Sequence, residues 1–203
     1  MYKLSYFTEE DEGKVFDFMV QNSFAVIAGY DGTFPVATHV PLDIKKEGDQ
    51  IMLTGHMMKN TDHHKAFSEN ENVLVIFNGP HCYVSASWYE KKEVASTWNY
   101  IDVHAKGKIK FTDEEGTKKI IEAITDKYET TESEAAFHNL PKEYVDRLVK
   151  AIVGFSIEVS QIGNVFKLSQ NHNLLTRQSI IRNLKGRNDE DSHEIAKEMQ
   201  KRY

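Results

Sequence analysis

The sequence is poor in the residues that crosslink a chain or anchor it in a membrane. It has a single cysteine, Cys82, among 203 residues, which excludes an internal disulfide and a thiolate metal site and fits a reducing compartment. No stretch approaches the roughly 18 apolar residues of a membrane helix, and residues 1–11 lack the apolar run of a signal peptide. We therefore expect a soluble, cytoplasmic protein that makes no membrane contact.

An excess of positive charge is missing as well. The 25 Lys and Arg are outnumbered by 31 Asp and Glu, which gives a formal net charge of −6. The surface as a whole is therefore not a nucleic-acid footprint, because phosphates bind clustered cations. One segment without acids carries four cations, Arg177, Arg182, Lys185 and Arg187, and it is the expected contact if DNA is bound. The sequence shows no clear helix-turn-helix pattern, so regulation through a protein partner or a small molecule is the alternative.

Standard catalytic motifs are also absent. There is no Gly-rich phosphate loop and no Gly-x-Ser-x-Gly turn, and His193-Glu194 is followed by Lys197 where a zinc protease has its second histidine. Histidine is frequent between residues 39 and 104, at His39, His56, His63, His64, His81 and His104. Only two of these are adjacent, and neighbours in sequence point to different sides of a helix. Hydrogen-bonded or solvated histidines are therefore favoured over a metal site.

The apolar residues are arranged mainly as strands. Runs at residues 24–30 and 34–42 flank Asp31-Gly32, a strong hairpin signal. Because Pro35 and Pro41 bracket the second run, that strand should lie at a sheet edge or beside a bulge. Further strands are predicted at 50–55, 72–77, 96–111, 152–162 and 164–168, with a turn at Gly79-Pro80.

Helical periodicity and capping signals predict six helices between these strands. They cover residues 9–21 and 62–69, a segment after a capping box of Thr112 and Glu115, a segment from Pro141 to about Lys150, and residues 174–184 and 192–202. Thr8 and Asp11 form the capping signal of the first helix, and residues 130–139 are expected to form a loop. The fold class is therefore α+β, an antiparallel barrel of about six or seven strands with peripheral helices. We expect a domain at 1–171 with a helical insertion at about 113–150, followed by a C-terminal helical appendage at 172–203.

One segment offers donors for an anion. Gly55 and His56 end a predicted strand, and Lys59 and Lys65 flank the start of the short helix that follows. Backbone N–H groups and cations at a helix start suit a phosphate. The plainer interpretation is a solvated helix start capped by Thr61 or by Asp62, whose charge opposes a phosphate.

Many short segments resemble the PaiB family of FMN-binding transcriptional regulators, in the family's order and spacing. The matching segments lie at 37–42, 54–56, 77–81, 83–85, 87–89, 97–100, 103–104, 152–155 and 167–171. The resemblance implies an FMN-binding split β-barrel related to pyridoxamine-phosphate oxidases. It also implies a homodimer with flavin at the subunit interface and a role in negative regulation of transcription.

The resemblance also suggests the cofactor-binding residues. By position, Thr38, His39 and Val40 follow the flavin ring, and Gly55, His56, Lys59 and Lys65 lie near the ribityl phosphate. Trp98 and Asn99 lie near the pocket, from the partner subunit, while Lys167, Ser169, Gln170 and Asn171 either close the site or serve a structural role. The family has an Asn-Pro-Gln-Trp-Arg run where this chain has residues 61–65, which keep only the cation. The phosphate site is therefore where the chain departs from the family.

The favoured function is a flavin-binding regulator or sensor. The alternatives are a flavin oxidoreductase of the pyridoxamine-phosphate oxidase-like class and a haem-handling split barrel in which His39, His56 or His104 is the axial ligand. No residue indicates a substrate, so the sequence does not decide whether the chain is an enzyme.

Overall fold

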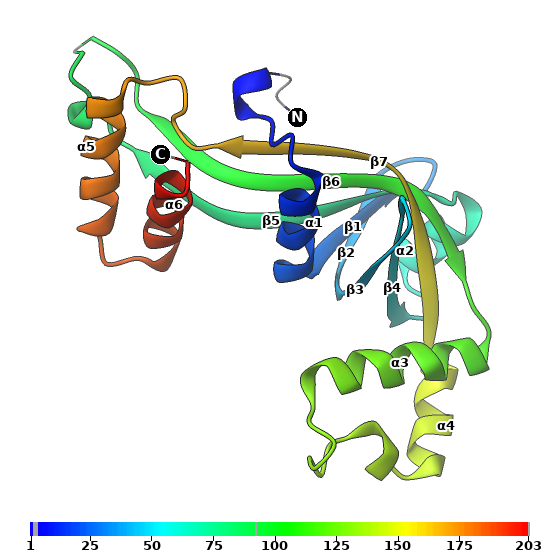
Figure 1. Cartoon of the computed structure of the whole chain (residues 1–203). Helices are drawn as coiled ribbons and strands as arrows, with labels where there is room; N and C mark the ends of the chain where they lie inside the picture. The colour runs from blue at the N-terminus through cyan, green and yellow to red at the C-terminus, as the bar shows by residue number, and fades with distance from the viewer. Residues whose placement is uncertain (2–3, 92, 203) are drawn as a thin grey trace. The chain divides into compact units, whose positions relative to one another are not determined.

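The computed structural model describes residues 1, 4–91 and 93–202 and contains one seven-stranded sheet. The strand order is β2-β1-β5-β6-β7-β4-β3 (Figure 1). The strands are β1 (Phe24–Tyr30), β2 (Pro35–Pro41), β3 (Asp43–Glu47), β4 (Gln50–Met58), β5 (Asn72–Val84), β6 (Thr97–Phe111) and β7 (Ile152–Lys167). The pairs β1–β2, β1–β5, β3–β4 and β4–β7 are antiparallel. Because β2 and β3 are the outer strands, the sheet is open, and the predicted edge position of the proline-bounded strand is confirmed.

Three details of the strand prediction were wrong. Gly79-Pro80 does not form a turn, because β5 continues through both residues. A proline is tolerated there because β1 pairs with β5 only at Leu74–Ile76, so no hydrogen bond to β1 requires an N–H at Pro80. The last two predicted strands are one, because Gly163 continues the extended backbone of β7. Strand β3 was missed, although the two-residue turn that follows it has Gly48 at φ 62°, a hairpin signal.

The six predicted helices are present. They are α1 (Glu12–Gln21), α2 (Asp62–Glu69), α3 (Glu114–Tyr128), α4 (Lys142–Ala151), α5 (Leu174–Lys185) and α6 (Glu190–Gln200). Their caps differ from the prediction in two places. Asp11, not Thr8, accepts from the first free N–H groups of α1, and Asp113, not Thr112, caps α3 by accepting from Gly116 N. A carboxylate is the stronger acceptor at a helix start, because it also interacts with the helix dipole.

Short 3-10 helices occupy three connecting segments. They are η1 (Ser5–Phe7), η2 (Ala86–Trp88) and η3 (Phe137–Asn139), the last within the segment expected to be a loop. No helix among the described residues combines the length and apolarity needed to cross a membrane.

The chain forms two compact units, each assembled from separate stretches of sequence. One unit comprises residues 1–17, 78–103 and 163–203, and the other comprises 18–77 and 104–162. We call them the terminal unit and the hairpin unit. In the terminal unit α5 packs on α6 through fully buried Ile180, Leu184 and Ile195. The core of the hairpin unit includes Leu53 and Phe155. The division expected from the sequence, with a boundary near residue 171, stays a prediction.

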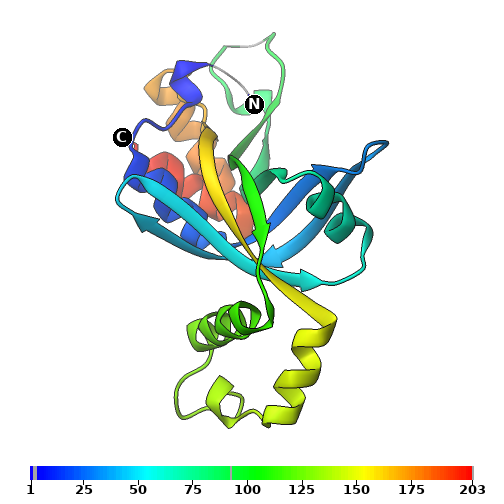
Figure 2. The ribbon, with the colours of Figure 1, turned by 90° about the vertical axis from the view of Figure 1, so that its right-hand side faces the viewer.

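Helices α3 and α4 connect β6 to β7 and pack on each other within the hairpin unit (Figure 2). Their apolar contact includes Ile121, Val145 and Val149. On the outside, Asp146 of α4 accepts from Lys118 of α3 and from Lys142, each at 2.7 Å. The hydrogen bond from Lys118, followed by that from Lys142, lowers the pKa of Asp146 to about 2.

The backbone of β7 passes close to Gly107 of β6. A Cβ at this position would collide with the carbonyl oxygen of Glu158 and lie 2.8 Å from Cγ2 of Ile157. We therefore predict that Gly107→Ala lowers the free energy of unfolding by about 1–3 kcal/mol, because the backbone cannot yield as a side chain can. Urea denaturation should show a lower midpoint with an unchanged slope.

Gly163→Ala is the matched control, since it makes the same change in β7 where the nearest heavy atom to the new Cβ, the Met1 sulfur, lies at 3.5 Å. It should be neutral or stabilise by up to about 1 kcal/mol. Equal losses in both variants would contradict the close approach at Gly107.

Candidate functional site

The predicted ring-binding strand is the free edge β2, and helix α2 contacts it within the hairpin unit. His39 is exposed, and its ring stacks on Phe24 of β1 with centroids 6.1 Å apart. Thr38 and Val40 point to the opposite, covered face, where Val40 is buried. The edge therefore offers one flat, partly aromatic side and unpaired backbone groups, both of which suit a planar ring with hydrogen-bonding nitrogens and oxygens.

Gly55 and His56 project from opposite faces of β4. A Cβ on Gly55 would meet the ring of Phe155 at 2.8 Å and the carbonyl oxygen of Pro41 at 3.2 Å, so this position faces the packed core beside the end of β2. His56 is opposite Gly154 in the β4–β7 register, and a Cβ on Gly154 would meet Ile120 and Thr117 of α3. His56 therefore lies on the face that α3 covers.

Burial shapes the chemistry of His56. Its Nδ1 is enclosed, and no hydrogen-bond partner for it is found among the described residues. The same burial lowers the pKa of His56, so the neutral imidazole is favoured. A half-buried imidazole that favours its neutral form is a poor partner for a phosphate dianion.

Polar side chains at the start of α2 already accept hydrogen bonds from the helix's own backbone. Thr61 caps the helix by accepting from His64 N at 3.3 Å, and Asp62 accepts from His63 N at 2.7 Å. The Lys59 ammonium donates to the carbonyl of Val149 at 3.1 Å, which stabilises the C-terminal turn of α4. Lys65 is exposed on α2. Of the four residues predicted to hold a phosphate, only Lys65 presents a solvent-facing cation on the helix beside β2.

The predicted pair Trp98 and Asn99 is separated by the alternation of β6. Asn99 is fully buried, whereas Trp98 is 52% exposed and its ring lies 6.1 Å from that of His81 and 6.0 Å from that of Tyr83. These three side chains, which we call the aromatic face, belong to β5 and β6 of the terminal unit.

A cavity of about 280 Å³ in the terminal unit brings together Asn99 and three residues of the predicted polar segment. Lys167, Ser169 and Asn171 line it, whereas the side chain of Gln170 hydrogen-bonds the backbone of its own segment at Leu168 N and Phe166 O. Other parts of the wall come from Phe7, Tyr89 and His172, which the sequence did not single out. No periodic pattern relates these distant residues, so no sequence signal could have found them.

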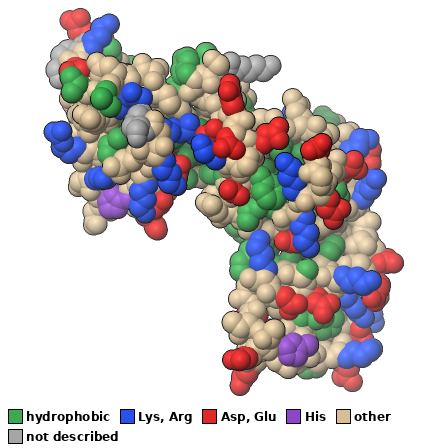
Figure 3. Space-filling view, viewed as in Figure 1, with side chains coloured by type: hydrophobic (Ala, Val, Ile, Leu, Met, Phe, Trp, Pro, Cys, Tyr) green, Lys and Arg blue, Asp and Glu red, His purple; other side chains and the backbone are tan. Residues whose placement is uncertain are grey.

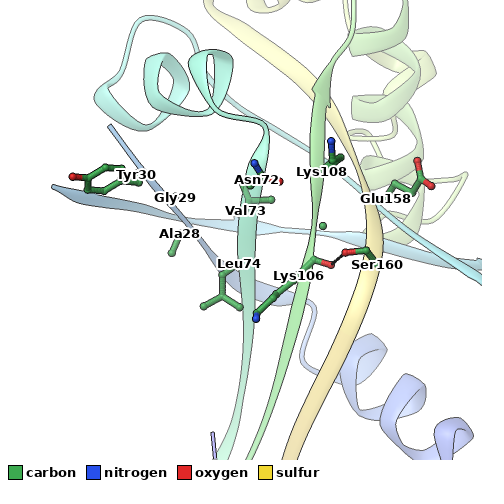
Figure 4. A pocket seen from close by; sticks show the side chains of 11 residues that line it. Ala28, Gly29, Tyr30, Asn72, Val73, Leu74, Lys106, Lys108, Glu158 and Ser160 are labelled. Atoms are coloured by element: carbon green, nitrogen blue, oxygen red, sulfur yellow. Dashed lines mark hydrogen bonds between the residues drawn. The ribbon is translucent and has the colours of Figure 1, made fainter. Parts of the chain in front are cut away.

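A larger groove of about 580 Å³ crosses β1, β5, β6 and β7 in the hairpin unit (Figure 4). Lys106 and Lys108 of β6 and Glu158 of β7 line it, and Ser160 donates to the Lys106 carbonyl at 3.2 Å. Lys108 forms an ion pair with Glu71. The sequence interpretation missed the exposed row at 106, 108 and 110, although the two-residue repeat of a strand places these lysines on one face.

The histidines do not gather into a ligand set in the part of the chain that the structure describes. No group of three or more His, Cys, Asp or Glu side chains there could hold a metal ion. His64 accepts a hydrogen bond from Asn60 N at 3.2 Å, and burial lowers its pKa, as it lowers the pKa of His104. His81 lies 3.4 Å from Asp191.

The arrangement of strands is shared with flavin-binding proteins of known structure. The flavocytochrome Anf3 from Azotobacter vinelandii superposes with a TM-score of 0.62 at 15% identity, over 82% of this chain and 72% of that one. The FAD and heme binding protein from Mycobacterium smegmatis superposes with a TM-score of 0.58 at 14% identity, over 79% of this chain and 73% of that one. The fold is the split β-barrel.

The sequence comparisons narrow this class to a family. Residues 1–161 match the family described as "Putative FMN-binding domain". The chain is 32% identical to the protease synthase and sporulation protein PAI 2 of Bacillus subtilis, over 98% of this chain and 97% of that protein. It is 30% identical to the uncharacterized protein AN0679 of Emericella nidulans, over 71% and 73%. The chain belongs to the PaiB family of FMN-binding proteins, as the sequence indicated.

The edge of β2 and Lys65 fit FMN, whereas the predicted phosphate cluster does not converge. On the ring side, His39 is exposed and the edge of β2 is free, whereas Thr38 and Val40 point to the covered face, and the position of the ring stays a prediction. On the phosphate side, Gly55 faces the core, His56 lies beneath α3 and Lys59 is bonded to α4. Lys65 keeps an exposed cation on α2, and the position of the phosphate stays a prediction.

Two lysine substitutions separate binding from folding. Lys65→Met should lower the affinity for FMN about tenfold or more, which corresponds to the loss of one charge-assisted hydrogen bond. It should leave the affinity for riboflavin unchanged, because riboflavin lacks the phosphate. Lys59→Met should instead lower the free energy of unfolding by about 1–2 kcal/mol through the lost bond to Val149 and leave FMN affinity unchanged.

Flavin fluorescence quenching and urea denaturation measure the two effects. A larger loss of FMN affinity in Lys59→Met than in Lys65→Met would place the phosphate at Lys59 and contradict this assignment.

Proposed function

We propose that this chain is a flavin-dependent regulator of transcription that acts as a homodimer. The observation that carries the proposal is the match along almost the whole length of a Bacillus subtilis protein named for protease synthesis and sporulation. Both processes depend on controlled gene expression. The match includes the terminal helices, which lie beyond the FMN-binding match at residues 1–161.

In this proposal FMN lies along β2 with its ring against His39 and its phosphate toward Lys65. The bound flavin supplies a centre that accepts and returns electrons. The chain's own residues hold and orient it: the free edge of β2 supplies N–H and C=O groups to the ring, and Lys65 balances the phosphate charge. A change in flavin occupancy or redox state then alters the surface that a partner contacts.

The aromatic face supports the dimer. Trp98 and Tyr83 are 52% and 42% exposed, and large aromatic side chains are enriched at protein interfaces. Tyr89, which follows η2 in the same unit, is buried at 5% exposure and does not add to this surface. The surface available to a second copy is therefore centred on Trp98.

Trp98→Asp should shift the protein from dimer to monomer, because it places a charge in the centre of an apolar contact. Light scattering should give twice the 23.4 kDa chain mass for the wild type and the single mass for the variant. Tyr144→Asp is the control, since Tyr144 is 43% exposed on α4 and should leave the dimer intact. A monomeric wild type, with and without FMN, would overturn the homodimer.

The basic segment presents two of its four cations to solvent. Arg182 and Lys185 are exposed on α5, together with Gln178 on the same helix. Figure 3 shows Lys and Arg side chains, in blue, over the part of the surface where Figure 1 labels α5 and α6. Arg187 is half-buried; it donates to the carbonyl of Tyr83 at 2.9 Å, and its guanidinium lies 4.9 Å from the ring centroid of Trp88. Arg187 is therefore a structural contact, and we assign DNA contact to Arg182 and Lys185.

The double variant Arg182→Ala/Lys185→Ala should bind duplex DNA more weakly in a salt-dependent way. On a random 30-base-pair duplex, the slope of log affinity against log salt should fall by about 2, since each lost phosphate contact removes about 0.9. Lys106→Ala/Lys110→Ala removes the same charge from the hairpin unit and should leave the slope unchanged. An unchanged slope in the α5 variant would contradict DNA contact at Arg182 and Lys185 and would favour regulation through a protein partner.

A further inference from the structure

The cavity of the terminal unit has a buried polar floor. Asn99 is fully buried, and Ser169, 2% exposed, donates to its Oδ1 at 3.1 Å. The Asn99 amide nitrogen is 3.6 Å from the sulfur of Met199, a weak acceptor. These contacts fix the orientation of the amide within the cavity wall.

Ser169 is held in a backbone conformation that favours glycine. Its φ is 61°, in the left-handed region, which is unfavourable for a residue with a Cβ. The strained conformation places the hydroxyl on Asn99. Such strain persists when surrounding contacts enforce it, and it is concentrated at ligand sites.

The cavity is cationic. Lys167 donates to Thr97 Oγ1 at 2.6 Å, and its ammonium lies 5.8 Å from the centroid of the Phe7 ring. No Asp or Glu is among the described residues that line the cavity. Partial burial lowers the pKa of Lys167 by removing some of the water around its ammonium, and an entering anion would stabilise the charged form.

The walls are aromatic. The rings of Tyr89 and His172 have centroids 4.6 Å apart and are tilted by 40°, and Phe7 contributes a third ring. Flat ligands pack well against such faces. The volume of about 280 Å³ is just below the roughly 300–1,000 Å³ of pockets that hold drug-sized ligands, so the cavity suits a single ring with one substituent.

We propose that this cavity binds a small planar aromatic carboxylate, with the carboxylate at Lys167 and the ring against Tyr89 and His172. The sequence interpretation assigned Asn99, Lys167, Ser169 and Asn171 to FMN, whereas a volume of about 280 Å³ suits a ligand smaller than a flavin nucleotide. The proposed ligand is distinct from the cofactor, so the proposal requires that FMN binds elsewhere. In a regulator, it would be the small-molecule signal.

Calorimetry with three probes tests this in the full-length protein. Benzoate carries both the ring and the charge, benzamide carries the ring alone, and inorganic phosphate carries charge alone. Benzoate should bind at least tenfold more tightly than benzamide, and phosphate should not compete with it. Equal affinity for benzoate and benzamide would show that Lys167 does not bind the carboxylate. Competition by phosphate would indicate a general anion site. Either result overturns the proposal.

Variants locate the binding. Lys167→Met should lower the affinity for benzoate at least tenfold and leave the affinity for benzamide unchanged. Lys167→Arg should keep the preference for benzoate over benzamide. Lys142→Met, at an exposed lysine, is the matched control. If Lys167→Met does not fold, the wild-type probe comparison and Lys167→Arg still decide the matter. Benzoate that competes with FMN would make the cavity part of the flavin site and overturn a separate ligand. Absence of benzoate binding to the wild type would refute the site altogether.

Discussion

The two-residue alternation of β6 is the constraint on which most of the candidate sites depend. Within the terminal unit it buries Asn99 in the cavity floor and turns Trp98 outward to the aromatic face. Within the hairpin unit it directs Lys106 and Lys108 to solvent, while Gly107 between them allows the backbone of β7 to approach. A shift of one residue would bury two ammonium groups and place a side chain where none fits, so the register is strongly specified.

Cations in this chain have different tasks because their surroundings differ. Lys59 is bonded to the end of α4, Lys108 to Glu71, and Arg187 to a backbone carbonyl beside an indole ring. Each is a structural contact. Lys65 is exposed beside a free strand edge, and Lys167 lies with aromatic side chains in a cavity whose described lining includes no carboxylate. The last two environments are the ones in which an anion from solution would be stabilised.

The departure at residues 61–65 has a structural counterpart at the start of α2. Where the family has a run ending in arginine, this chain has Thr61 as a helix cap and Asp62 bonded to the neighbouring backbone N–H. These groups satisfy helix donors that a phosphate would otherwise use. The free edge of β2 and the exposed ammonium of Lys65 are not part of these hydrogen bonds at the helix start.

The sequence by itself determined the six helices, the Asp31-Gly32 hairpin and the edge position of the strand between Pro35 and Pro41, because these depend on local periodicity and on the missing N–H of proline. Family membership followed from short segments in order. The tertiary structure alone decided that Lys59 caps α4, that His56 lies beneath α3 and that Phe7, Tyr89 and Lys167 share one cavity. These contacts join residues that are far apart in the chain. A local sequence pattern does not indicate which distant side chains will pack together.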